Sequence, residues 1–77
     1  MPIAFVLMSA EPGAEKSVVD ELNSIDGVTQ VFPVYGVYDV IARIEAKDMY
    51  ELRETILHCI RKRKGIQSTS TMIVSED

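Results

Sequence analysis

The chain has 77 residues and a mass of 8.6 kDa, enough for one small domain. Hydrophobic residues make up 47% and charged residues 26%, which is typical of soluble globular domains and excludes a disordered chain. The net charge of −4 disfavours direct binding to nucleic acid phosphates. Cys59 is the single cysteine and His58 the single histidine, which excludes an internal disulfide and a complete Cys/His zinc site in one chain.

The hydrophobic residues are spread along the chain and never form a run long enough to span a membrane. The apolar start lacks a basic leading region, so it does not resemble a secretion signal. With a free thiol, these features predict a cytoplasmic protein. A chain this small buries little surface on folding, and we expect oligomerisation to supply further stability.

The first half of the chain predicts a strand, a helix and a second strand. Residues 3–10 are rich in apolar and β-favouring side chains and predict a strand. Residues 14–25 carry apolar side chains at helical spacing and predict a helix, which Gly27 would follow at the left-handed C′ position. Residues 28–35 predict a strand, and Pro33 places it at an edge or at a bulge because proline cannot donate to a sheet ladder.

The second half repeats the pattern. Residues 39–46 predict a strand that pairs with the preceding one through a tight connection at Gly36. Asp48 with Glu51 three residues later resembles a capping box and predicts a helix start. The basic residues 61–64 crowd the expected end of this helix before Gly65, and residues 66–75 predict a last strand.

The predicted order is β-α-β-β-α-β, which with right-handed crossovers builds an α+β, ferredoxin-like fold with strand order 4-1-3-2. Strand 3–10 has apolar side chains on both faces, because Ile3, Phe5 and Leu7 alternate with Ala4 and Val6. Two helices cover only one face of such a sheet. We expect a partner subunit to cover the other face; the alternative is a central strand with a partly exposed second face.

Side chains that could carry catalysis are few. His58 and Cys59 are neighbours on a helix and point about 100° apart, so they do not face each other. Cys59 lies on the apolar stripe and is predicted to be a buried structural residue, whereas His58 is expected to face solvent or a subunit contact. The basic run at 61–64 could indicate nucleic acid, but no stacking aromatics accompany it, and a solvated helix end is the simpler interpretation.

The segment around Gly36, Tyr38 and Asp39 has the features of a binding loop. A carboxylate can accept from an ammonium group, and exposed glycine amides can donate to a carboxylate, so the loop could hold a zwitterion such as an amino acid. The last strand adds consecutive hydroxyls at residues 68–71, two on each face. The alternative is an ordinary turn followed by a threonine-rich edge strand.

The stretch YGVYDVIARIEAKDMYELRETILHCIRKRKGIQSTSTMIV resembles the effector-binding domain of the Lrp/AsnC (feast/famine) transcription regulators, also called the RAM domain. The Gly-x-Tyr-Asp turn at Gly36, Tyr38 and Asp39 is similar to the family signature. So is the terminal pattern of Gly65 and Ile66 followed by Thr69 and Thr71. The resemblance extends over essentially the whole chain.

This resemblance implies an amino-acid effector bound in clefts between dimers, with homodimers assembling into an octamer or decamer. It implies a ligand site at Gly36, Tyr38, Asp39, Thr69, Ser70 and Thr71, with Asp39 on the ligand ammonium and amides near Gly36 on its carboxylate. Family regulators carry an N-terminal helix-turn-helix domain, so we expect residues 1–77 to be a single RAM domain without one. Such a protein would act with full-length regulators, without direct DNA binding, catalysis, cofactor or metal.

One alternative function belongs to another class. The same dimeric α+β barrel type of assembly occurs in small cofactor-independent monooxygenases and isomerases, so the fold alone does not decide between binding and catalysis. Such an enzyme needs a titratable group facing a cleft in each subunit. On the predicted sheet the candidates are Asp39, Arg43 and Glu45.

Overall fold

The computed structural model describes residues 1–74 of the chain, apart from the side chain of Cys59. The strands are β1 (Ile3–Ala10), β2 (Val28–Pro33), β3 (Val40–Glu45) and β4 (Ile66–Ile73). Helix α1 (Glu15–Leu22) connects β1 to β2, and α2 (Met49–Glu54) continues directly as the π-helix η1 (Thr55–Ile60). The predicted end of the last strand at Ser75 and the predicted burial of Cys59 lie outside the described residues.

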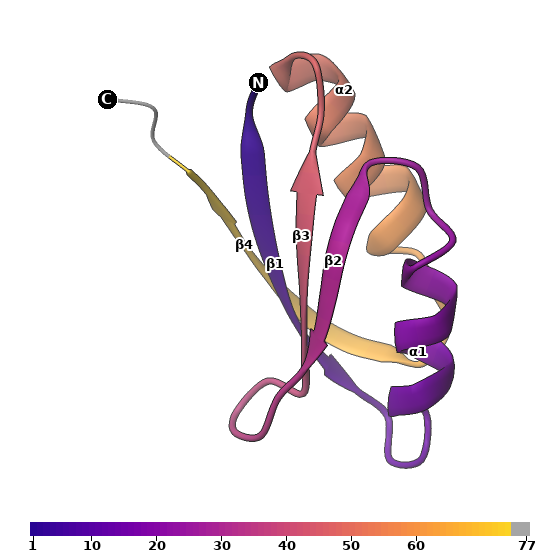
Figure 1. Ribbon diagram of the computed structural model, residues 1–77. Coiled ribbons are helices and arrows are strands. Elements are labelled where there is room, and N and C mark those ends of the chain that lie inside the picture. The colour runs from indigo at the N-terminus through magenta and orange to yellow at the C-terminus, as the bar shows by residue number, and fades with distance from the viewer. Residues whose placement is uncertain (75–77) are drawn as a thin grey trace.

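The strands form one antiparallel sheet in the order β2-β3-β1-β4, and the helices lie together on one of its faces (Figure 1). This order is the one predicted, so the α+β, ferredoxin-like fold is confirmed. Strand β2 is an edge strand with Pro33 as its last residue, and the ladder to β3 shifts register between Val28 and Gln30. No helix within residues 1–74 is long and apolar enough to cross a membrane.

The core lies between the sheet and the helices. Alternate residues of the two central strands point toward the helices and are buried, and the helices contribute apolar side chains at helical spacing. Both periodicities are visible in the sequence, but the alternation along β1 does not indicate which of its two apolar faces meets the helices. The members of the core are Ala4, Val6, Met8, Ala10, Val18, Leu22, Ile25, Val40, Ala42, Ile44, Ala46, Leu52, Ile56 and Ile60.

Helix α1 is shorter than the sequence predicts. It ends at Leu22, three residues before the expected end, and the amides of Ser24 and Ile25 close turns onto Glu21 and Leu22 (3.1 Å each). Ile25 is nevertheless buried, because the turns fold it back onto the core. Gly27 has a φ of +96° but sits beyond these turns, so its prediction as the C′ residue of the helix was wrong. It instead leads into β2, where its carbonyl accepts from the amide of Glu45 at 2.8 Å.

Helix α2 begins as predicted and ends differently. Asp48 is the N-cap, and its carboxylate accepts from the amide of Glu51 at 2.8 Å. The Glu51 carboxylate in turn accepts a longer bond of 3.4 Å from the amide of Lys47, so the capping box is approximate. The helix then widens into η1, where the amide of Arg61 bonds to the carbonyl of Ile56 at 3.0 Å. Residues 61–62 and 64–65 form turns, so the basic run lies just beyond the helix and not within it.

Candidate functional site

The sheet face opposite the helices is apolar along its centre. In β1 the side chains alternate between buried positions on the helix side and half-buried positions on this face, which confirms that both faces of the strand are apolar. The register places Ile41 of β3 beside Leu7, and Met72 of β4 beside Phe5. Phe32 of the edge strand β2 is 42% exposed and Met72 is 54% exposed. We call the following residues the open face: Ile3, Phe5, Leu7, Phe32, Ile41 and Met72.

Charged side chains of β3 lie among the residues of the open face, because Arg43 is the register partner of Phe5 and Glu45 that of Ile3. Arg43 and Glu45 form an ion pair of 3.2 Å, and the same guanidinium nitrogen donates to the hydroxyl of Thr29 at 2.7 Å. Both charged side chains are about one-third exposed or less. These are two of the three titratable residues predicted for the sheet, and they bond to each other across the surface. The third, Asp39, lies in the loop before β3.

The Asp39 carboxylate contacts the end of β1. Its Oδ2 atom accepts a hydrogen bond from the amide of Ala10 at 3.1 Å, and the amide of Asp39 itself donates to the carbonyl of Met8 at 2.8 Å. Its carbonyl accepts from the amide of Val34 at 2.8 Å, which closes the β2–β3 loop. Among the residues that the structure describes, the second carboxylate oxygen has no hydrogen-bond partner. The side chain therefore fastens the loop to β1 and keeps one acceptor available.

The loop that carries Asp39 borders a hollow of about 470 Å³. Its walls come from the start of α1 and from the end of β2, and Tyr35 on the loop is fully exposed. Gly36 has a φ of +150° and open space where a side chain would be, so the backbone there is accessible. Tyr38 is half-buried. The residues that line the hollow are Glu15, Pro33, Val34, Tyr35 and Asp39.

The hydroxyl residues of β4 divide between the two faces of the sheet. Ser70 pairs with Leu7 on the open face, whereas Thr69 pairs with Met8 and Thr71 with Val6 on the helix side. Ser68 is also on the open face and shares a hydrogen bond of 2.6 Å with the hydroxyl of Ser9. This is the division predicted from strand alternation.

Within one chain, the loop residues and the β4 hydroxyls do not meet. Strand β1 lies between them, because it pairs with β3 on one side and with β4 on the other. Gly36, Tyr38 and Asp39 lie together at one end of β3, whereas Thr69, Ser70 and Thr71 lie on the far edge strand. Within one chain the two groups are therefore separated by the width of β1.

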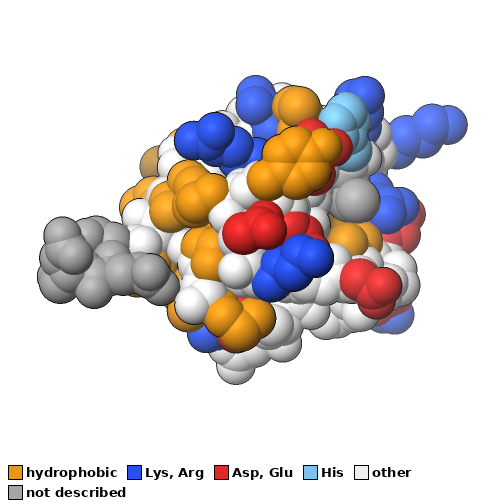
Figure 2. Space-filling model, turned by 90° about the horizontal axis from the view of Figure 1, so that it is seen from above, with side chains coloured by type: hydrophobic (Ala, Val, Ile, Leu, Met, Phe, Trp, Pro, Cys, Tyr) orange, Lys and Arg blue, Asp and Glu red, His pale blue; other side chains and the backbone are white. Residues whose placement is uncertain are grey.

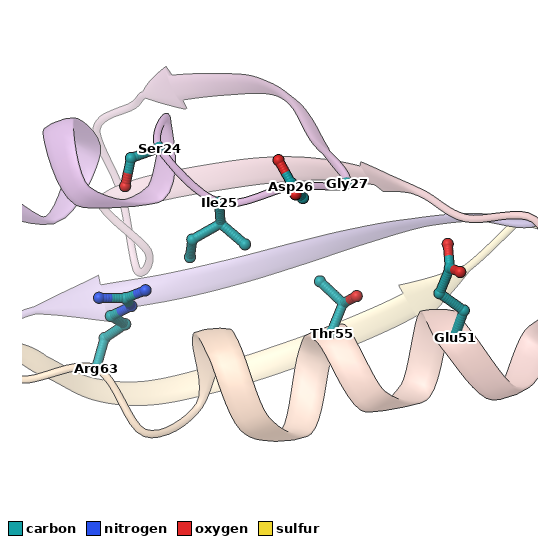
Figure 3. A pocket seen from close by; sticks show the side chains of 7 residues that line it. All are labelled: Ser24, Ile25, Asp26, Gly27, Glu51, Thr55 and Arg63. Atoms are coloured by element: carbon teal, nitrogen blue, oxygen red, sulfur yellow. The ribbon is translucent and has the colours of Figure 1, made fainter.

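A larger hollow of about 620 Å³ lies on the helix side, between the α1–β2 connection and the helix formed by α2 and η1 (Figure 3). We call it the helix-side groove. Sequence patterns do not predict it, because its walls come from segments far apart in the chain. The only features of these walls that the sequence itself indicates are the left-handed Gly27 after Asp26 and the polar start of α2. Its lining residues are Ser24, Ile25, Asp26, Gly27, Glu51, Thr55 and Arg63.

The charged residues after η1 are dispersed. Arg63 is half-buried and lies 3.5 Å from the Glu21 carboxylate, whereas its neighbours in the basic run are exposed. His58 is exposed, as expected, and its Nε2 lies 3.5 Å from Glu54. On the face seen in Figure 2, basic side chains alternate with acidic and hydrophobic ones. Among the described residues, no group of three or more His, Cys, Asp or Glu side chains is placed to hold a metal ion.

Comparison with protein-family models assigns this architecture to a known family. Residues 3–77 match the family model described as the Lrp/AsnC ligand-binding domain. The chain belongs to the Lrp/AsnC ligand-binding domain family. The match spans nearly the whole sequence and includes every described strand and helix, which confirms the resemblance noted from the Gly-x-Tyr-Asp turn.

Relatives of this Lrp/AsnC domain occur inside longer proteins. The HTH-type transcriptional regulator PH0140 of Pyrococcus horikoshii is 37% identical over 73 residues, which are 95% of this chain and 46% of the regulator. The chain thus spans about half the length of that relative. A homocitrate synthase of Saccharolobus islandicus is 41% identical over 58 residues, which are 75% of this chain and only 12% of that protein.

Solved structures of other proteins have the same fold. The crystal structure of FFRP-DM1 superposes with a TM-score of 0.93 at 39% identity and covers 97% of this chain and 100% of its own. The regulator NMB0573 of Neisseria meningitidis, solved as a complex with L-methionine, has a TM-score of 0.85 at 18% identity. That alignment covers 99% of this chain and 51% of the regulator, and it shows the fold alone.

Proposed function

We propose that this Lrp/AsnC domain is a cytoplasmic sensor that binds an amino acid, assembles into a homodimer and then a ring, and modulates transcription together with full-length regulators. The observation that carries the proposal is the open face on a domain of this family. Burying half-exposed apolar side chains against a second copy removes them from water, and the gain is about 25 cal/mol per Å² of apolar surface. A second copy of the same face is a self-complementary partner.

The charged residues of the open face are compatible with this arrangement. Arg43 and Glu45 lie beside Phe5 and Ile3 and bond to each other, and Arg43 also bonds to Thr29, so packing two sheets leaves these charges paired. Ser70 lies beside Leu7 on the same face. A hydroxyl at this position can bond across the contact or to water at its rim.

The proposed effector site combines the β2–β3 loop with β4 of another copy. The second oxygen of Asp39 accepts from the ligand ammonium, and the exposed backbone at Gly36 donates to the ligand carboxylate. Tyr38 contributes apolar surface. The edge strand β4 of a neighbouring copy adds hydroxyls, Ser70 from its open face or Thr69 and Thr71 from its helix side, since β1 separates them from the loop within one chain. The complex of the Neisseria regulator with L-methionine supports an amino acid as the ligand class.

A binding role fits the relatives better than an enzymatic one. A similar segment occurs in a transcriptional regulator and in a small part of a homocitrate synthase, so one module accompanies two different activities. A module shared in this way is expected to sense a ligand and to leave catalysis or DNA binding to the other part of the protein.

The assembly is tested by sedimentation equilibrium at micromolar concentration. The unaltered chain should sediment as a dimer or larger. Leu7→Arg places a charge in the middle of the open face and should shift the population to smaller species. Leu57→Arg is the matched control, because Leu57 is 46% exposed on the helix side and is not part of the open face. A folded 8.6 kDa monomer of the unaltered chain would contradict the proposal.

The ligand is tested by a thermal-shift screen of the twenty amino acids. A ligand present at 100 times its dissociation constant stabilises the folded state by about 2.7 kcal/mol. At least one amino acid should raise the melting temperature of the assembled protein and lose this effect in the Leu7→Arg variant. No shift with any amino acid would remove the effector part of the proposal.

A further inference from the structure

A smaller hollow on the helix side lies beside the outer edge of the sheet. Strand β4 forms this edge, because it pairs with β1 alone (Figure 1). Thr71 and Ile73 lie on its helix side, since their register partners are the buried Val6 and Ala4. Together with one face of α2 and η1 they border a hollow of about 320 Å³. We call it the β4 groove, and its lining residues are Arg53, Ile56, Leu57, Arg61, Thr71 and Ile73.

The β4 groove combines apolar side chains with two basic ones. Ile56 is buried, whereas Leu57 and Ile73 are each nearly half exposed. Arg53 and Arg61 are exposed, and within residues 1–74 neither of them forms an ion pair. Two unpaired cations beside exposed aliphatic side chains are complementary to a partner that presents acidic and apolar groups together.

The backbone of β4 adds a second means of recognition. An edge strand carries a row of N–H and C=O groups that no neighbouring strand binds, and an extended peptide can pair with them. We propose that the β4 groove docks an extended acidic segment of another protein, which adds to β4 as a further strand. Every second side chain of such a segment would lie on the helix side of the sheet, over the groove. This inference concerns a polypeptide partner and does not depend on the proposed effector site.

The spacing of the arginines defines the sequence of the docked segment. Arg53, Leu57 and Arg61 follow one another at intervals of four residues, about one helical turn. The two arginines are therefore roughly 10–12 Å apart along the axis, since the rise is about 1.5 Å per residue and slightly smaller in the wider η1. Four residues of an extended strand cover about 13 Å. Two acidic residues four positions apart, with an aliphatic residue midway, place their side chains at both guanidinium groups and at Leu57.

The 77 residues of this chain contain no such segment. Glu11 and Glu15 are the one pair of acidic residues four positions apart, and the residue midway between them is Gly13. Glu15 is also the first residue of α1, so the pair does not lie on an extended strand. A second copy of this chain therefore lacks the complementary sequence, and the partner for the β4 groove is a different protein.

The first experiment measures the binding of three labelled peptides to the unaltered chain by fluorescence anisotropy, without added amino acids. The peptide Ser-Thr-Asp-Thr-Leu-Thr-Asp-Thr-Ser has the required spacing and should bind saturably. The second peptide has Asn in place of both Asp residues. The third, Ser-Thr-Thr-Asp-Leu-Asp-Thr-Thr-Ser, has the same composition, but its acidic residues lie on the face opposite the leucine.

The second and third peptides should each bind at least about threefold more weakly at an ionic strength of about 0.01 M, because two exposed ion pairs are lost and screening is weak. The difference should shrink as salt is added. No saturable binding of the first peptide would overturn the proposal. Equal binding of the first and third would also overturn it, because the groove would then respond to net charge and not to spacing.

The addition of a strand is tested by N-methylation of the first peptide. In a paired strand, successive residues point their amides alternately toward the partner strand and away from it. Methylation at the leucine nitrogen or at the nitrogen of the following threonine should therefore have unequal effects. One of the two peptides should bind about tenfold more weakly, and the other should be nearly unaffected. Equal effects of the two methyl groups would refute pairing with β4.

Variants of the chain assign the binding to the β4 groove. Arg53→Gln and Leu57→Ser should each weaken the first peptide at least about threefold, through loss of one ion pair and of the apolar contact. Lys62→Gln is the matched control for charge, because Lys62 is exposed and lies outside the groove. Circular dichroism confirms that each variant is folded. Unchanged affinity in both groove variants, or an equal loss in Lys62→Gln, would refute the groove as the docking site.

Sedimentation of Leu57→Ser without peptide tests the competing occupant. If the groove serves another protein, this variant should assemble as the unaltered chain does, since Leu57 lies on the opposite side of the sheet from the open face. A shift to smaller species would show that a second copy of the chain fills the β4 groove, and it would overturn the proposal.

Discussion

Replacing Asp39 by Ala or by Asn separates the structural contribution of its carboxylate from a contribution to ligand binding. In the free chain, Oδ2 accepts from the amide of Ala10 at 3.1 Å in a half-buried setting. Hydrogen bonds to charged groups contribute about 1.5–3 kcal/mol, and partial exposure places this one at the lower end. Asp39→Ala should therefore lower the free energy of unfolding by about 1.5 kcal/mol, a fall in melting temperature of roughly 6–12 °C for a chain of this size.

Asp39→Asn should behave differently in the two measurements. The amide oxygen of Asn can still accept from Ala10, so the loss of stability should stay below about 1 kcal/mol. The charge that would bind a ligand ammonium is lost completely, so the affinity for the amino acid found in the thermal-shift screen should fall about tenfold or more.

Both quantities can be measured on the same samples. Urea denaturation at one fixed chain concentration gives the stability, since assembly makes unfolding depend on concentration. Isothermal titration calorimetry gives the affinity. Equal affinity in the unaltered chain and in a stably folded Asp39→Asn protein would refute the role of Asp39 in binding. An Asp39→Ala protein as stable as the unaltered chain would show that the bond to Ala10 contributes nothing measurable.

Three further outcomes are expected. Gly65→Ala should destabilise the folded state by about 1–3 kcal/mol in thermal denaturation, because Gly65 has a φ of +88° and the new Cβ would lie 3.2 Å from the Cβ of Ala14. Gly13→Ala is the matched control and should destabilise it less, because Gly13 has a similar φ of +85° but open space around it. Asp48→Ala should cost about 1 kcal/mol through loss of the N-cap, and Asp48→Asn should restore most of it. A gel-shift assay at physiological salt should show no sequence-specific DNA binding by this chain, and a nanomolar specific shift would contradict the proposed role as a partner that does not itself bind DNA.

The element order and the strand order were predictable because they depend on local and repetitive signals. The alternation along β1 places Val6 and Phe5 on opposite faces, and this pattern is complete within a few residues, whereas the structure decides that the Val6 face meets the helices. Asp48 caps its helix through a residue only three positions away. Pro33 lacks an amide proton and so predicts an edge or a bulge, and the strand order of the ferredoxin-like fold selects the edge.

The end of each helix was decided by tertiary packing. Helix α1 stops at Leu22 although Ile25 continues its apolar spacing, because turns bring Ile25 onto the core while the chain redirects into β2. The widening into η1 likewise has no marker among residues 55–60, yet Ile56 and Ile60 are both buried there. Helix propensity differs by only a fraction of a kcal/mol between most residues, so burial of these side chains outweighs it.

The sites depend most on the tertiary structure. The residues of the Gly-x-Tyr-Asp turn could be recognised in the sequence, but the bond from Asp39 to Ala10 joins positions 29 residues apart, which no local pattern encodes. The helix-side groove brings Asp26, Glu51 and Arg63 together from separate segments. Sequence patterns record which chemical groups are present and which face of an element they occupy. Their distances from one another are set only when the sheet and helices pack, because hydrophobic burial acts on whole faces and not on individual polar groups.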